Sequence, residues 1–246
     1  VQKYGGTSGG STGRIRLVAA RLLATQRAGH DVVAVISAMA GVTDGLIKLA
    51  RETSTEPSAR EMDALLATGE QSSSALVAMA VNAIGRKAVS LTGAAAGIVT
   101  DGAHTKAKIA HISPRQIREL IAEDFIVVVA GFQGQSQEGA ITTLGRGGSD
   151  LTALALARSS DLFAAGVDFH GVHDWNVEWE TFVPGWRILK DQEARRTAFL
   201  SSPMAYWDTW KSRVPPIHGD EDRNVAVSQA GRLAAAARKP SVRVGT

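Results

Sequence analysis

The sequence contains no cysteine, and this absence excludes several kinds of protein at once. Disulfide scaffolds, thiolate nucleophiles, cysteine-ligated zinc sites and iron–sulfur clusters all require that residue. No apolar run approaches the roughly 18 to 20 residues of a membrane-spanning helix, and the amino terminus lacks the basic and then apolar layout of a secretory signal. We therefore expect a cytoplasmic protein, away from membranes, whose chemistry relies on oxygen and nitrogen groups.

A surplus of one sign of charge is missing as well. The 246 residues include 27 basic and 24 acidic side chains, which gives a formal net charge of +3. This near balance gives no electrostatic reason to expect nucleic acid or anionic lipid as a partner. A hydrophobic fraction of 44% is instead typical of a globular chain, either one large α/β domain or two small ones.

Aromatic residues are scarce, and the tryptophans are unevenly placed. All of them lie between residues 175 and 210. Hydrophobic periodicity also weakens after about residue 160, and it returns as a helix at 230–239 and a strand at 242–244. Clustered tryptophans more often pack within a domain or between subunits than form a platform for a ligand. The composition therefore separates the first 160 residues from the rest of the chain.

Strands and helices are expected to alternate over these first 160 residues. Helical periodicity runs from Ser11 or Thr12 to Gly29, and a further helix starts at Pro114, a residue favoured in the first turn. Two more helices are expected at 43–53 and 60–83, and apolar runs typical of buried strands occupy 1–4, 31–37, 87–91 and 125–130. This alternation predicts an α/β fold, a three-layer αβα sandwich with a mostly parallel central sheet.

The first candidate site is a glycine-rich loop between the first strand and the first helix. Lys3 ends the strand, and Gly5, Gly6, Thr7 and Ser8 follow it. Free backbone N–H groups and the helix dipole favour an anion at such a place, so the loop predicts a phosphate site. The lysine precedes the glycines, which is not the order of the usual P-loop. A plain glycine-rich turn is the alternative, and it is favoured for this loop taken alone.

A second candidate loop follows a later strand and opens a helix. Arg146 offers a fork of donors for a carboxylate or phosphate, and Gly147 and Gly148 let a ligand approach the backbone before Ser149 and Asp150. A flexible turn with a solvated arginine is the alternative interpretation of this segment.

Two further segments carry polar residues near the same expected edge of the sheet. Ser37 closes a buried strand, at the carboxyl end where open α/β sheets bind ligands. Glu70 follows Gly69 inside a helical stretch. That pair predicts either a kink, which is favoured for the segment alone, or a carboxylate that meets a cationic group of a ligand.

These segments, together with 91–102 and 131–134, occur in the order in which aspartate kinases carry them. The chain resembles the catalytic domain of aspartate kinase, in the amino-acid kinase superfamily, closely over about 1–157 and more loosely over about 228–246. The resemblance implies one amino-acid kinase domain over 1–246. Lobe 1–150 would hold the acceptor substrate and the phosphate loops, and lobe 151–246 would face the nucleotide. The chain stops where the family's ACT domains would begin, so we expect no feedback control through such domains.

The resemblance also implies an activity, the transfer of the γ-phosphoryl group of Mg-ATP to the side-chain carboxylate of L-aspartate. ATP and Mg²⁺ would be the cofactors, and the product would enter lysine and threonine biosynthesis. A homo-oligomer is expected by resemblance only. The implied sites are as follows: Lys3 and Asp150 would be catalytic, Ser37, Glu70, Arg146 and Ser149 would hold aspartate, and Lys3, Gly5, Gly6, Thr7, Ser8, Gly147, Gly148 and Asp168 would face the phosphates or nucleotide.

The nucleotide side departs from the family's pattern. Asp168 is present, but His170 stands where a second acidic residue is usual, and no Asp-Pro-Arg segment follows. The family's phosphate-binding lysine is also missing, since its two possible placements put Arg213 or Asn224 there. His170 and His173 stand three apart with a glycine between them, and we expect no metal at that pair.

These departures leave two alternatives to an aspartate kinase. The domain could phosphorylate another small carboxylate, or it could have lost productive ATP binding and act as a binding or regulatory subunit. Residues 160–227 could also be a rearranged replacement of the family's own segment.

Overall fold

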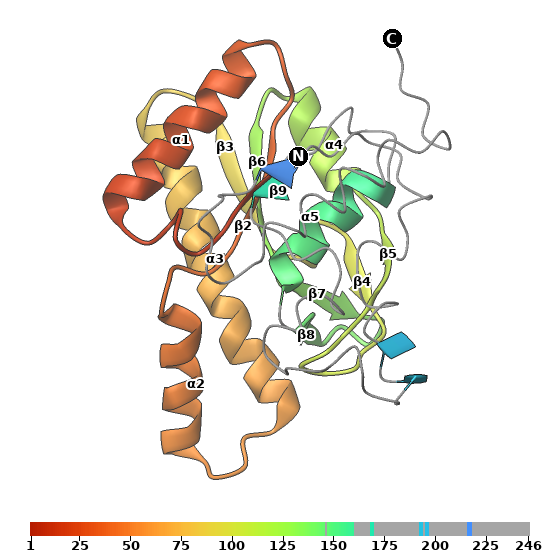
Figure 1. Cartoon of the computed structure of the whole chain (residues 1–246). Coiled ribbons are helices and arrows are strands. Elements are labelled where there is room, and N and C mark those ends of the chain that lie inside the picture. Colours follow the sequence, from red (N-terminus) through yellow and green to blue (C-terminus); the bar gives the residue numbers. More distant parts are fainter. Residues whose placement is uncertain (146, 160–167, 170–191, 194, 197–215, 218–246) are drawn as a thin grey trace.

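The computed structural model describes residues 1–145, 147–159, 168–169, 192–193, 195–196 and 216–217. Its centre is a four-stranded sheet in the order β1-β2-β6-β3 with every neighbouring pair parallel (Figure 1). The strands are β1 (Gln2–Tyr4), β2 (Val33–Ile36), β3 (Ala88–Leu91) and β6 (Ile126–Ala130). The runs of β2 and β6 are completely buried, as expected for parallel strands covered on both faces.

Helices cover both faces of this sheet. Ala34 and Ile36 of β2 pack with the buried residues of α1 and α3, while Val33 and Val35 pack with those of α4 and α5. The helices are α1 (Thr12–Arg27), α2 (Val42–Thr53), α3 (Ala59–Ala83), α4 (Arg115–Ala122) and α5 (Gly148–Ser159). The predicted three-layer αβα sandwich is therefore confirmed.

A second, smaller sheet lies beside the first, in the order β5-β4-β7-β8 (Figure 1). Its strands are β4 (Ile98–Thr100), β5 (Ile109–Ile112), β7 (Gln133–Ser136) and β8 (Ile141–Thr143), and only the β4–β7 pair is parallel. We did not predict this sheet as a unit. The strands are only three or four residues long, β7 is wholly polar apart from its glycine, and each of the others contains at least one polar residue, so they lack the longer apolar runs by which the central strands were found.

The ends of the helices follow local sequence signals. Ser11 caps α1 and its hydroxyl accepts the N–H of Arg14 at 3.3 Å. Pro114 is the residue before α4 and not part of its first turn. Helix α3 continues without a break through Gly69, where a Cβ would lie 3.0 Å from the Cβ of Ala38. This glycine therefore allows a close approach between α3 and the loop after β2 and does not end the helix.

A short pair of parallel strands follows α5 in the sequence. Strand β9 (Asp168–Phe169) pairs in parallel with β10 (Pro216–Ile217), and β9 lies beside β1 and α5. The tryptophan-rich stretch, the helix expected at 230–239 and the strand expected at 242–244 lie outside the described residues. None of the helices in the described part of the chain has both the length and the apolar composition that crossing a membrane requires.

Candidate active site

Three loops meet at the carboxyl edge of the parallel sheet. The N–H of Ser37, after β2, donates to the carbonyl of Tyr4 at 3.0 Å, and the N–H of Gly131, after β6, donates to Ile36 at 3.0 Å. The loops after β1 and β2 are also joined, because the N–H of Ala40 donates to the carbonyl of Gly6 at 3.2 Å. This edge is where parallel α/β sheets bind their ligands.

A buried ion pair lies at this edge. The Nζ of Lys3, in β1, is 2.6 Å from Oδ1 of Asp150, in the first turn of α5. Both residues are less than one-tenth exposed. The positive end of the α5 dipole and the ammonium of Lys3 both stabilise the Asp150 carboxylate. The pair fixes a positive and a negative group side by side at this edge of the sheet.

The glycine loop passes directly beside Lys3. A Cβ on Gly5 would lie 3.5 Å from the Nζ of Lys3, and a Cβ on Gly6 would lie only 2.8 Å from the carbonyl oxygen of Ala38. Any side chain at Gly6 would therefore push the loops after β1 and β2 apart. Ser8 closes the turn by donating its N–H to Gly5 at 3.0 Å, and Thr7, between them, is exposed. The loop is compact and open to an incoming anion.

Glu70 brings a second carboxylate to the same edge. Its Oε1 accepts the N–H of Ala38 at 3.1 Å, while its Oε2 is buried and has no hydrogen-bond partner among the described residues. Burial raises the pKa of this carboxyl from 4.5 to about 7, against the opposing effect of the Ala38 hydrogen bond. A buried carboxylate oxygen without a partner is costly unless a ligand supplies one. Glu70 is thus suited to receive an ammonium group.

The turn before α5 packs against the end of β6. Gly131 lies so close to Ser149 that a Cβ there would be 2.7 Å from its Oγ, and a Cβ on Gly148 would be 2.8 Å from the ring of Phe132. Gly147 has a φ of 75°, which glycine adopts without strain. Ser149 is buried, and Ser37 is half-buried.

The structure brings most of the predicted site residues to one edge of the sheet. Lys3 and Asp150 are in contact, and Ser37, Glu70 and Ser149 lie on elements that meet there. Asp168 begins β9, which lies beside β1. The other predictions fall outside the described residues, namely those for Arg146, His170, His173, Arg213 and Asn224.

Sequence reasoning missed a set of buried polar residues below this edge. Asp63 is fully buried in α3, and Gln133 of β7 accepts a hydrogen bond from Gln71 at 3.0 Å and donates one to the carbonyl of Ala67 at 3.0 Å. The spacing of Asp63 and Glu70 was the available signal, because residues seven apart share one helix face. In the described residues, no group of three or more His, Asp or Glu side chains is placed to hold a metal ion.

Comparisons with protein families give two matches to this chain. The amino acid kinase family matches residues 1–176. The prolyl oligopeptidase family matches residues 121–245, so the two matches overlap over 121–176. The second match covers the part of the chain in which the sequence departs from the aspartate kinase pattern.

Curated relatives and solved structures agree with the first match. The chain is 56% identical to the aspartokinase of Geobacillus stearothermophilus over 157 residues, which cover 64% of this chain and 39% of that protein. It is 53% identical to the aspartokinase of Mycolicibacterium smegmatis over 162 residues, 65% of this chain and 38% of that protein. The crystal structure of aspartate kinase from Synechocystis is similar with a TM-score of 0.64 and 32% identity, over 89% of this chain and 38% of that one. The chain thus spans about two fifths of the length of these relatives.

Proposed function

We propose that the chain phosphorylates the side-chain carboxylate of L-aspartate, because it belongs to the amino acid kinase family through residues 1–176. Its carboxyl-terminal half, residues 121–245, belongs to the prolyl oligopeptidase family. Mg-ATP would be the donor, and the products would be 4-phospho-L-aspartate and ADP. The observation that carries the proposal is the unpartnered Oε2 of Glu70 beside the loops that hold the Lys3–Asp150 pair. Identity above 50% to two aspartokinases supports the choice of acceptor.

The acceptor would be held by groups of both signs. Glu70 would receive the ammonium of aspartate, and this contact would give its buried Oε2 the partner it lacks. The hydroxyls of Ser37 and Ser149 would donate to the substrate's carboxylates, and Arg146 would add a bidentate contact. Specificity for an amino acid then follows, because a substrate without the ammonium would leave the Glu70 carboxylate buried and unpaired.

Phosphoryl transfer depends on charge neutralisation and in-line positioning. An oxygen of the aspartate side-chain carboxylate attacks the γ-phosphorus, the bond from that phosphorus to the bridging oxygen breaks, and ADP leaves with the bond's electrons. Lys3 and the backbone of Gly5, Gly6, Thr7 and Ser8 would stabilise the charge on the transferring group. Asp150 holds the ammonium of Lys3 in place at 2.6 Å. Gly147, Gly148 and Asp168 would face the nucleotide.

Magnesium would arrive bound to the phosphates of ATP. Such an ion usually takes one or two carboxylates from the protein and the rest of its ligands from phosphate and water. Asp150, which pairs with Lys3 at the phosphate edge, is a carboxylate that could contribute to this arrangement.

The test is an assay of aspartyl hydroxamate from the purified chain with Mg-ATP, L-aspartate and hydroxylamine. We expect product from the wild type and none from Lys3→Ala, which removes the charge beside the transferring phosphate. Lys3→Arg serves as a second variant that keeps Asp150 paired if Lys3→Ala fails to fold. No product from folded wild-type protein would reject the proposed activity.

A second candidate function is favoured by the prolyl oligopeptidase match. That match covers the region where the nucleotide side of a kinase would lie, so the chain could bind aspartate without transferring phosphate. Calorimetric titration separates the two cases: aspartate binding without ATP binding would support a non-catalytic binding domain, and binding of both would support the kinase. A similar titration with other small carboxylates would test a different acceptor.

The match does not lead us to propose peptidase activity. A serine nucleophile of that kind follows the pattern Gly-x-Ser-x-Gly and requires a histidine base. Ser149 has Leu151 where the second glycine would stand. Among the residues that the structure describes, no histidine is hydrogen-bonded to Ser149, whose hydroxyl instead packs against Gly131.

The remaining parts of the proposal concern organisation. We propose one kinase domain with an acceptor lobe over 1–150 and a nucleotide lobe from 151. A cytoplasmic homo-oligomer is the arrangement that we expect from the resemblance to aspartate kinases. Sedimentation of the purified chain would test the oligomer.

A further inference from the structure

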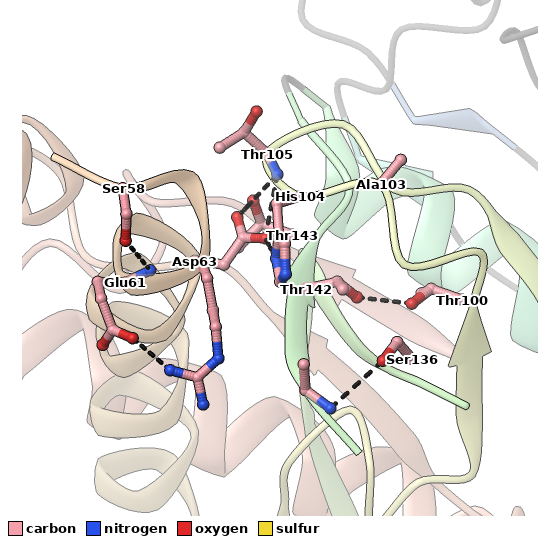
Figure 2. A network of polar contacts seen from close by, with 12 residues as sticks. Ser58, Glu61, Asp63, Thr100, Ala103, His104, Thr105, Ser136, Thr142 and Thr143 are labelled. Carbon is pink, nitrogen blue, oxygen red and sulfur yellow. Dashed lines mark hydrogen bonds and ion pairs between the residues drawn. The ribbon is translucent and has the colours of Figure 1, made fainter. Parts of the chain in front are cut away.

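A buried carboxylate on α3 joins three elements that lie far apart in sequence. Asp63 is completely buried. Its Oδ2 lies 2.7 Å from Nδ1 of His104, both of its oxygens accept the N–H of Thr105 at 3.0 Å, and its Oδ1 accepts the hydroxyl of Thr143 at 2.5 Å (Figure 2). One side chain of α3 therefore holds both the loop after β4 and the end of β8.

This network stabilises a backbone conformation that is unfavourable for a threonine. Thr105 has a φ of 65°, a value that β-branched residues rarely adopt. The two bonds from its N–H to Asp63 hold it there, and its carbonyl faces the turn that follows β8. A Cβ on Gly145 would lie 3.4 Å from the Thr105 oxygen and 3.9 Å from the Cα of Lys106. The strained residue thus forms one wall of that turn.

The turn is fixed from the other side as well. The N–H of Leu144 donates to the carbonyl of Phe132 at 2.9 Å, and Phe132, with a φ of 67°, is a second non-glycine residue in the left-handed region. Inside the turn, Gly148 donates its N–H to Gly145 at 3.0 Å and Asp150 donates to Gly147 at 3.0 Å. These hydrogen bonds connect the turn to the first residues of α5, so the position of the turn also sets the position of Asp150, the partner of Lys3.

We propose that Asp63 is a positioning residue for the acceptor site. Through Thr143 and Thr105 it holds the turn between β8 and α5, and so sets where Ser149 and Asp150 stand. It touches no substrate itself. The functional part of this inference rests on the proposed aspartate site, whereas the tether itself rests only on the contacts of Asp63.

Two neighbouring threonines of β8 provide a matched pair for the test. Thr143 bonds to Asp63, while Thr142 bonds to the hydroxyl of Thr100 at 2.7 Å (Figure 2). Both threonines are almost fully buried, and the hydroxyl of each forms a hydrogen bond with one buried side chain. Thr143→Val and Thr142→Val therefore remove the same group from the same strand, but only Thr143→Val touches the tether. Thr143→Ser keeps the hydroxyl and serves as the conservative variant.

The experiment measures hydrogen exchange of the peptide spanning 144–151 in the protein without ligand, and L-aspartate binding by calorimetry. In Thr143→Val we expect at least tenfold faster exchange of this peptide and roughly tenfold weaker aspartate binding. In Thr142→Val and Thr143→Ser we expect both quantities within about twofold of wild type. Thermal unfolding shows whether Thr143→Val and Thr142→Val lose similar stability, so that a general loss of folding is recognised.

Each outcome decides between the proposal and its rejection. Unchanged exchange over 144–151 in Thr143→Val would overturn the tether, as would an equal change in Thr142→Val. Faster exchange with unchanged aspartate affinity would overturn the positioning role. If the wild type itself does not bind L-aspartate, the proposed function is rejected, and the exchange comparison still decides whether Asp63 holds the turn.

Discussion

Helix α3 carries two buried carboxylates seven residues apart, and they differ in how their charges are satisfied. Every oxygen of Asp63 accepts a hydrogen bond from the protein, whereas Glu70 has one oxygen bonded to Ala38 and one without a partner among the described residues. A carboxylate whose bonds are all made by the chain stabilises the fold. One that is left half-satisfied costs stability and is available to a ligand.

The largest effect is expected when the satisfied carboxylate is removed. Asp63→Ala leaves the buried hydroxyl of Thr143 without its partner and also removes the hydrogen bonds to His104 and to the N–H of Thr105. Because bonds to a charged group contribute more than neutral ones, we expect the free energy of unfolding to fall by about 3 to 5 kcal/mol. Urea unfolding measures it. Asp31→Ala, which removes an exposed aspartate, is the control and should change stability by less than about 0.5 kcal/mol. Similar losses in the two variants would contradict the role given to Asp63.

The unsatisfied carboxylate predicts a pH dependence of stability. Because the pKa of Glu70 is raised to about 7 in the folded state from 4.5, the folded protein holds this proton more tightly than the unfolded chain. Its charging therefore lowers stability as pH rises from about 4.5 through 7, by at most about 3 kcal/mol. Urea unfolding at a series of pH values measures this loss. Glu70→Gln should remove it, and an unchanged pH profile in that variant would assign the loss to another group.

Glu70→Gln also tests, through ligand binding, whether the unsatisfied oxygen of Glu70 is available to a ligand. The amide cannot supply the negative charge that an ammonium requires, so we expect L-aspartate to bind roughly 10 to 100 times more weakly, which corresponds to about 1.5 to 3 kcal/mol. Calorimetry at pH 8, where Glu70 is charged, measures the loss. Aspartate affinity equal to that of the wild type would show that Glu70 does not contact the ligand.

The smallest effect is expected at the glycine beside Glu70. Gly69→Ala gains helix propensity but places a Cβ 3.0 Å from the Cβ of Ala38, whose N–H bonds to Glu70. These effects oppose each other, so we expect a stability change within about 1 kcal/mol and a weakening of aspartate binding by a few fold. Gly45→Ala, inside α2 where a Cβ would meet open space, is the control for binding and should leave aspartate affinity unchanged.

The sequence alone predicted the central layers of this fold well. Strands β2 and β6 are continuous apolar runs, and α1 shows helical periodicity with a serine cap, so local patterns were enough to find them. The small sheet of β4, β5, β7 and β8 was not found as a unit. Its strands form two antiparallel pairs of consecutive strands, but the β4–β7 pairing that joins them is distant in sequence, as is the buried bond between Thr100 and Thr142, and no local pattern reveals either.

For the site, the sequence determined which residues gather, and only the tertiary structure decided what each does there. Glycine loops after parallel strands must meet at one edge of the sheet, so Lys3, Ser37 and Asp150 were predictable as neighbours. The sequence could not predict which of Asp63 and Glu70 has all its hydrogen bonds made by the protein, because both are acidic residues on the same face of one helix. Their difference depends on which donors the loops after β2 and β4 bring to them, and the folding of the chain sets those contacts.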